Sequence, residues 1–120
     1  MSKNQRSQIA ETAKMLNLSE EALVRLSKVR WHKTRVVINL GIVSVYYHDT
    51  LVVRVTRRFV YLTFDGWYTP TTRKRINQVS QILGLGIRAF QSNYITLIDV
   101  GSLNYHICAQ EHLALLRSHK

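Results

Sequence analysis

The chain has 120 residues, 46% of them hydrophobic, which predicts one folded domain and excludes a disordered basic tail. Its single cysteine, Cys108, excludes an internal disulfide and suits a reducing compartment. No apolar run approaches the ~18 residues of a membrane span, and residues 1–14 lack the apolar core of a signal peptide, so we expect a soluble intracellular protein.

The charge balance is the strongest global feature of the sequence. Seventeen Lys and Arg residues against seven Asp and Glu residues give a formal net charge of +10. A field of this size favours polyanions, with nucleic acid ahead of an anionic membrane surface. The alternative is that the charge only keeps a small protein soluble.

The N-terminal third predicts a helical hairpin. Residues 1–7 are polar and expected to fray, and helices are predicted over 8–16 and 20–29, with Asn17 ending the first and Ser19 capping the second. The spacing of apolar residues over these two helices is typical of DNA-binding helix-turn-helix motifs. However, Glu20 and Glu21 would repel phosphates at the start of the second helix, which favours a packing hairpin.

From Thr34 the apolar period changes to two, which is typical of β-strands. The pattern predicts one long central strand as far as Tyr47, with a bulge or bend at Gly41. Turns at 48–50 and 57–58 then separate it from two further strands. Three consecutive strands with short links predict an antiparallel meander.

A capped helix follows, in which Thr69 or Thr71 is the cap and Gly84 ends the helix. A β-hairpin is then expected over 87–100, a short strand or turn over 105–108, and a short helix over 112–117. The expected fold is therefore α+β in a single domain, 1–120: a helical hairpin (8–30), an α+β core (34–100) and a C-terminal segment (101–120).

The run from Gly66 to Asn77 resembles a motif shared by short bacteriophage proteins, approximately Gly-Gly-Trp-x-Thr-x-Thr-Thr-x-x-Arg-hydrophobic-Asn. The matching residues are Gly66, Trp67, Thr69, Thr71, Thr72, Arg75, Ile76 and Asn77. Asp65 departs from the pattern in place of the first Gly, and Tyr68 replaces a residue that is often basic. The resemblance covers about 45–100 and implies a phage origin and a small α+β domain, expected in the host cytoplasm or in the virion. It supplies no activity and no catalytic residue.

Three basic groups are candidate anion-binding sites. The first is the start of the helix after the threonine cluster, where free N–H groups and the helix dipole favour a phosphate. The second surrounds Trp31 and His32, and the third, which comprises Arg54, Arg57 and Arg58, lies around the turn between the second and third strands of the meander. The candidate residues are Thr71, Thr72, Arg73, Lys74, Arg75, Arg57, Arg58, Arg30, Lys33 and Arg35.

Each basic group also has a structural explanation. Trp67 can be core and Thr71 a cap, with Arg75 paired internally to Asp65. The Trp31 segment can be a hinge against the sheet, and charge at a hairpin can simply protect an edge strand. At the first group both interpretations stay open for Trp67, Thr71 and Arg75, and binding is favoured for Arg73 and Lys74. At the second group the hinge is favoured.

Catalytic and metal sites have little support. His106, Cys108 and His112 lack the paired cysteine spacing of a structural zinc site, so no metal and no other cofactor is predicted. The carboxylates form no spaced acid–base pair, and no phosphate-binding glycine loop is present, so no enzyme is predicted.

The expected partner is nucleic acid, bound through its phosphates. The alternatives are a protein-interaction module that binds an acidic host protein, and a site for a small anion such as a nucleotide.

Overall fold

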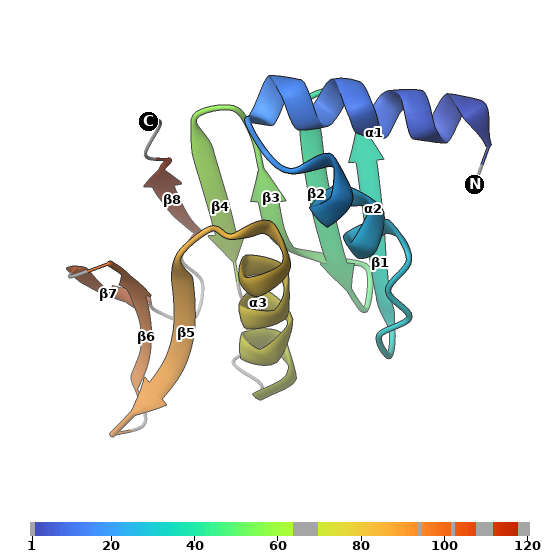
Figure 1. Cartoon of the computed structure of the whole chain (residues 1–120). Helices are drawn as coiled ribbons and strands as arrows, with labels where there is room; N and C mark the ends of the chain where they lie inside the picture. Colours follow the sequence, from blue (N-terminus) through green and yellow to red (C-terminus); the bar gives the residue numbers. More distant parts are fainter. Residues whose placement is uncertain (1, 64–69, 94, 102, 108–111, 118–120) are drawn as a thin grey trace.

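The computed structural model describes residues 2–63, 70–93, 95–101, 103–107 and 112–117. Within these residues, three helices cover one face of a five-stranded antiparallel sheet, and a smaller antiparallel sheet lies beside the third helix (Figure 1). The predicted α+β class is therefore confirmed. The elements are α1 (Lys3–Leu16), α2 (Glu20–Ser27), β1 (Thr34–Asn39), β2 (Ile42–Tyr47), β3 (Thr50–Val55), β4 (Phe59–Thr63), α3 (Pro70–Leu83), β5 (Ile87–Ser92), β6 (Ile95–Val100), β7 (Leu103–Ile107) and β8 (His112–Leu116).

The helical hairpin is confirmed, together with both of its inner caps. Asn17 adopts the left-handed conformation at the end of α1, and the Ser19 hydroxyl accepts a hydrogen bond from the Ala22 N–H. The expectation that residues 1–7 fray is wrong for residues 2–7, because Ser2 caps α1 and residues 3–7 belong to it. Ser2 caps α1 through a reciprocal pair of hydrogen bonds with Gln5, which satisfies N–H groups of the first turn and lets the helix begin at Lys3.

The predicted long strand from Thr34 to Tyr47 is wrong, because the chain reverses at Leu40 and Gly41. Gly41 has a φ of +81°, which a glycine adopts without steric cost, and it makes a tight turn between β1 and β2. The meander therefore has four strands. Strand β1 lies at the edge of the sheet rather than at its centre.

The predicted C-terminal helix is also wrong. Residues His112–Leu116 form strand β8, which pairs antiparallel with β4 from Phe59 to Thr63. Its pairing gives the sheet the order β1-β2-β3-β4-β8. Without β8, strand β4 would leave its backbone hydrogen-bonding groups exposed along an edge.

The core fills the space between the helices and the larger sheet. Side chains from α1, α2 and α3 meet the valines and leucines of β2, β3 and β4 there. The fully buried members include Leu16, Leu23, Leu26, Ile76, Val43, Val45, Val53, Val55 and Leu62. The helix-facing side chains alternate with a second set on the opposite face of the sheet.

Thr12 fixes α1 to the β1–β2 turn. Its hydroxyl is fully buried, donates a hydrogen bond to the Asn39 carbonyl at 2.8 Å and accepts one from the Gly41 N–H at 3.2 Å. Replacing Thr12 with valine keeps the shape but leaves two backbone groups without a partner, so we expect about 2 kcal/mol loss of unfolding free energy. Urea denaturation of Thr12→Val measures this loss. Ser27→Ala, at an exposed hydroxyl, is the control and should change stability by less than about 0.5 kcal/mol.

Candidate functional site

The start of α3 holds five of the predicted anion-binding residues in different environments. Thr72 is fully buried and Arg75 is only 5% exposed, whereas Thr71 and Arg73 are partly exposed and Lys74 is exposed. The side chain of Arg73 donates a hydrogen bond to Gln91 in β5, 3.3 Å away. Solvent therefore reaches three residues of this group, Thr71, Arg73 and Lys74.

Arg75 joins α3 to the chain that leads into β1. Its guanidinium donates hydrogen bonds to the Thr34 hydroxyl (2.7 Å), the His32 carbonyl (3.2 Å) and the Gln78 side chain (2.9 Å). It also lies 5.5 Å from the centre of the Trp31 ring. Burial lowers the pKa of Arg75 from its usual value, and the electrostatic effect of Tyr47 opposes that shift.

These contacts favour the structural role for Arg75. Its expected partner, Asp65, and the nearby Trp67 and Thr69 lie outside the described residues. All three guanidinium nitrogens already meet neutral acceptors of the same chain. Arg75 and the buried Thr72 are therefore not part of an accessible binding surface.

The second basic group is divided by the structure. Arg30 and Lys33 are exposed on the segment between α2 and β1, and Trp31 packs against the core as the hinge interpretation requires. Lys33 has a φ of +52° in the turn that begins β1. Arg35, two residues later, points to the opposite face of the sheet and lies 4.6 Å above the Tyr46 ring. The three cations therefore do not form one site.

Two members of the third group, Arg57 and Arg58, are exposed in the β3–β4 turn as predicted, while Arg54 lies on β3 and is partly buried. The structure adds Arg117 to it, because the Arg117 N–H donates to the Arg58 carbonyl and its guanidinium donates to the Thr56 carbonyl, 3.0 Å away. Burial lowers the pKa of Arg117 from its usual value. No local pattern in the sequence indicates this neighbour, because its position depends on the pairing of β8 with β4.

The sheet face opposite the helices carries a group of arginine and aromatic side chains that the sequence analysis did not assemble. We call this group the open sheet face, and it comprises Arg35, Ser44, Tyr46, Arg54, Phe59, Tyr61 and Leu116. Adjacent strands bring its members together in register, with Arg35 opposite Tyr46, Ser44 opposite Arg54, Arg54 opposite Tyr61, and Phe59 opposite Leu116. Leu116 is 72% exposed and Tyr61 38% exposed.

Hydrogen bonds organise the centre of the open sheet face. The Arg54 guanidinium donates to the Ser44 hydroxyl at 3.0 Å and to the Tyr46 hydroxyl at 3.3 Å. The rings of Phe59 and Tyr61 lie 5.8 Å apart and are tilted by 39°. The arginines of this face thus contact neutral groups, so their charges remain available to an anion.

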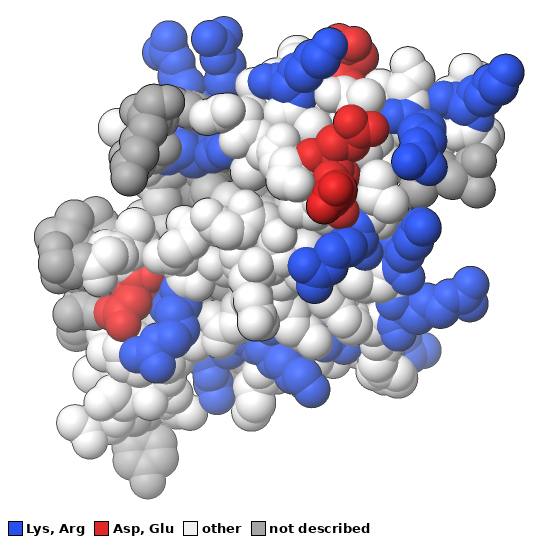
Figure 2. Space-filling view, viewed as in Figure 1, with Lys and Arg blue, Asp and Glu red and all other residues white. Residues whose placement is uncertain are grey.

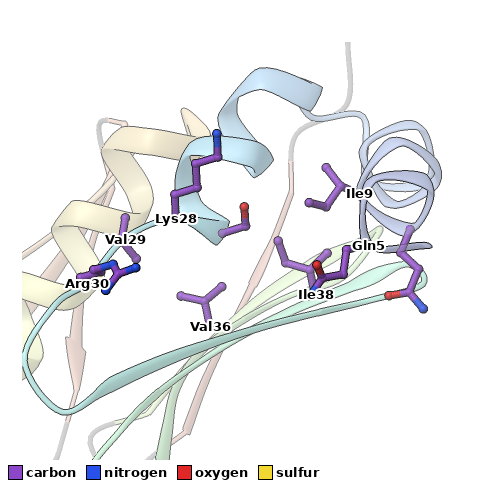
Figure 3. Close-up of a pocket in the computed structure, with 9 residues that line it drawn as sticks. Gln5, Ile9, Lys28, Val29, Arg30, Val36 and Ile38 are labelled. Atoms are coloured by element: carbon purple, nitrogen blue, oxygen red, sulfur yellow. The ribbon is translucent and has the colours of Figure 1, made fainter. Parts of the chain in front are cut away.

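A groove of about 560 Å³ lies on the helical side of the sheet, between α1, the end of α2 and the edge strand β1. Figure 3 shows Ile9, Val36 and Ile38 around its apolar floor, with Lys28 and Arg30 at one end and Gln5 at the other. An apolar floor with cations at one end suits an extended peptide that carries acidic residues.

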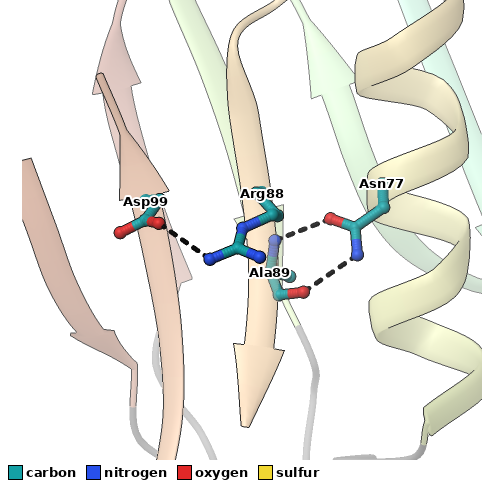
Figure 4. Close-up of polar contacts among 4 residues, drawn as sticks. All are labelled: Asn77, Arg88, Ala89 and Asp99. Carbon is teal, nitrogen blue, oxygen red and sulfur yellow. Dashed lines mark hydrogen bonds and ion pairs between the residues drawn. The ribbon is translucent and has the colours of Figure 1, made fainter. Parts of the chain in front are cut away.

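Charge is unevenly distributed over the molecule. The acidic residues that the structure describes lie on α1 and α2 (Glu11, Glu20 and Glu21), in the β2–β3 turn (Asp49) and on β6 (Asp99). Figure 2 shows acidic side chains on the helical face, with basic side chains around its margin. Asp99 is already paired with Arg88 at 3.2 Å (Figure 4). The open sheet face includes arginines and no carboxylate among its described side chains.

The described residues contain no cluster of three or more His, Cys, Asp or Glu side chains arranged to hold a metal ion. Cys108, a member of the cluster discounted from the sequence, lies outside these residues. Among the same residues, none of the helices is long and apolar enough to cross a membrane.

The comparison with curated proteins and the comparison with solved structures each returned no match. A protein-family model, described as Kyanoviridae Gp96 protein, matches residues 12–113. The match covers the helical hairpin from Thr12, strands β1 to β7 and α3, and so extends the bacteriophage resemblance beyond the threonine-rich motif. The chain therefore belongs to the Kyanoviridae Gp96 protein family, a family of cyanophage proteins.

Proposed function

We propose that this phage protein is a nucleic-acid-binding accessory protein that contacts the phosphate backbone. The observation that carries the proposal is the charge of the open sheet face: Arg35 and Arg54 lie there, while the described acidic residues lie on the helices, in one turn and on the small sheet. A surface that binds a phosphate backbone needs cations without nearby carboxylates, because carboxylates would repel phosphates.

The accessible cations form a path along the larger sheet. Lys33 lies in the turn that begins β1, and Arg57 and Arg58 lie in the β3–β4 turn, at the opposite end of the sheet (Figure 1). Arg35 and Arg54 of the open sheet face lie between these ends, whereas Arg73 and Lys74 belong to α3 on the helical side. A strand of nucleic acid running diagonally over the open sheet face would meet positive charge along its path.

The expected signature is a steep salt dependence. Each phosphate that the protein neutralises contributes a slope of about −0.7 for a single strand, or about −0.9 for a duplex, to log K against log salt. Fluorescence anisotropy with a labelled oligonucleotide between about 50 and 200 mM salt measures this slope. We expect Arg57→Gln combined with Arg58→Gln to weaken binding and to reduce the slope by about one to two units.

The matched control is Lys3→Gln combined with Arg6→Gln. It removes the same charge from exposed positions of α1, on the helical side of the sheet, and should change affinity and slope far less. Absence of binding to single-stranded and duplex oligonucleotides at 50 mM salt would contradict the proposal. So would an equal loss of affinity in both double variants, since binding would then follow net charge alone.

The groove beside β1 favours a second candidate function, the docking of an acidic segment of a host protein. Strand β1 is an edge strand, so its outer backbone groups can pair with an added strand, while the apolar floor accepts alternate side chains. A pull-down after nuclease treatment tests this candidate. A stoichiometric host protein retained by the native chain and lost with Lys28→Glu combined with Arg30→Glu would support it.

A further inference from the structure

We propose that the open sheet face is the binding site of this protein for single-stranded nucleic acid, with bases stacked on aromatic rings and phosphates held by arginines. The inference rests on the proposed function and names both the site and the class of ligand. The register of four neighbouring strands brings arginine and aromatic side chains together on this face.

The alternation follows directly from the strand pairing. Arg35 on β1 faces Tyr46 on β2, and Arg54 on β3 faces Tyr61 on β4. Tyr46 itself faces Leu51 on β3, so the two pairs lie in adjacent rows, which the hydrogen bond from Arg54 to the Tyr46 hydroxyl joins. Neighbouring strands are about 4.8 Å apart, so a chain that crosses them diagonally meets an arginine or an aromatic ring at each step. Nucleic acid alternates charged phosphates and flat bases on a similar scale of several ångströms.

The aromatic residues have two different roles. Tyr46 is engaged, because Arg35 covers its ring and Arg54 donates a hydrogen bond to its hydroxyl, so this residue orients the two arginines. Tyr61 and Phe59 are the rings available to bases, since Tyr61 is 38% exposed and the two rings are tilted by 39° rather than stacked. Base–aromatic stacking tolerates any sequence, because every base has a π-face.

The shape of the face distinguishes a single strand from a duplex. A duplex presents its phosphates outward and keeps its bases stacked on each other, so rings on a sheet surface cannot reach them. A single strand can splay its bases onto Tyr61 and Phe59 while its phosphates lie near Arg35 and Arg54. The exposed rings are therefore of use to an unpaired strand and of little use to a duplex.

The charge of the face disfavours the other obvious occupant, a second copy of the chain. Two such faces packed against each other would bring arginines together with no described carboxylate on either side to balance them. A like-charge contact of this kind is unfavourable, whereas a phosphate backbone supplies the missing negative charge. An uncharged peptide is also disfavoured, because it supplies no negative charge to balance the arginines.

The test is fluorescence anisotropy with a labelled 12-nucleotide oligothymidylate and with a mixed-sequence duplex of the same length. The native protein should bind the single strand more tightly than the duplex. Tyr61→Leu, which keeps an apolar side chain on the strand, should weaken single-strand binding about fivefold or more and leave duplex binding nearly unchanged. Arg54→Gln should weaken binding of both.

The chain offers a matched control on the smaller sheet. Arg88 lies 4.6 Å above the Phe90 ring there, and it is also paired with Asp99. Phe90→Leu and Arg88→Gln therefore make the same chemical changes at another arginine–aromatic pair, and neither should alter binding of either probe. Thermal unfolding verifies that each variant is folded, and Tyr61→Phe should restore single-strand binding in a folded protein.

The outcomes separate this inference from the proposed function. Equal affinity for single strand and duplex, with no effect of Tyr61→Leu, overturns the open-face site while leaving phosphate binding in place. Absence of binding to both probes overturns both proposals. A dimer in sedimentation that Tyr61→Leu dissociates assigns the face to a second copy and also overturns the inference.

Discussion

Arg75→Ala is expected to lower the free energy of unfolding by about 3 kcal/mol, which corresponds to roughly 10 °C in melting temperature for a chain of this length. The guanidinium donates to three acceptors on two segments. Its removal leaves the Thr34 hydroxyl without this donor, and the His32 carbonyl keeps only its hydrogen bond from the Thr34 hydroxyl. It also removes the packing of a cation against the Trp31 ring. Urea denaturation followed by circular dichroism measures the loss.

Two further variants identify the cause of that loss. Arg75→Lys keeps the charge, but an ammonium group cannot direct donors to acceptors on three sides, so most of the destabilisation should remain. Lys74→Ala removes the exposed neighbouring cation and should change stability by less than about 0.5 kcal/mol. Full stability of Arg75→Lys would show that charge, rather than hydrogen-bond geometry, holds α3 in place.

The elements that the sequence predicted correctly are those that local rules determine. Asn17 and Ser19 end one helix and begin the next because a left-handed residue and a hydroxyl cap act within a single turn. Pro70 begins α3 and Gly84, with a φ of +67°, follows its end, for the same local reason. The period of apolar residues then identified which side of each helix is buried.

The two incorrect elements have different causes, a distant pairing and a concealed local turn. Leu113 and Leu116 have helical spacing, but β8 forms because strand β4, about fifty residues earlier, offers an edge on which Leu113 and Leu115 join the core. Here tertiary pairing overrides local pattern. At Leu40 and Gly41, apolar residues on both sides of the glycine concealed a two-residue turn as a continuous strand.

The predictions for the candidate site also divide into those that rest on local signals and those that depend on distant contacts. Lys74, Arg57 and Arg58 were placed correctly as exposed cations because charge at a helix start or a hairpin is a local signal. The burial of Arg75 was not predictable, since Thr34 and His32 lie about forty residues earlier in the chain. The open sheet face requires the register of four strands, and a one-residue error in any pairing would move Arg54 to the helical side.

Asn77, a residue of the threonine-rich motif, fixes the smaller sheet to α3. Its side-chain amide donates to the Ala89 carbonyl at 2.9 Å and its oxygen accepts from the Ala89 N–H at 2.6 Å, so it pairs with β5 as a neighbouring strand would (Figure 4). Strand β5 is an edge of its sheet. Asn77 therefore both joins the two parts of the fold and protects a backbone edge.

Asn77→Asp is expected to destabilise the protein by about 3 kcal/mol at pH 7, because it replaces a donor with a carboxylate oxygen that faces the Ala89 carbonyl. That repulsion raises the pKa of the new carboxyl above its usual value. The penalty is therefore complete at pH values above the raised pKa and declines as the pH falls through it, since a protonated carboxyl can donate to the carbonyl again. Urea denaturation between about pH 7 and pH 4.5 should show the unfolding free energies of the native chain and the variant converging as the pH falls.

The control is Gln81→Glu, which adds the same charge at an exposed position of the same helix. Its unfolding free energy should not converge with that of the native chain as the pH falls. If it does converge, general electrostatics rather than the lost donor is responsible.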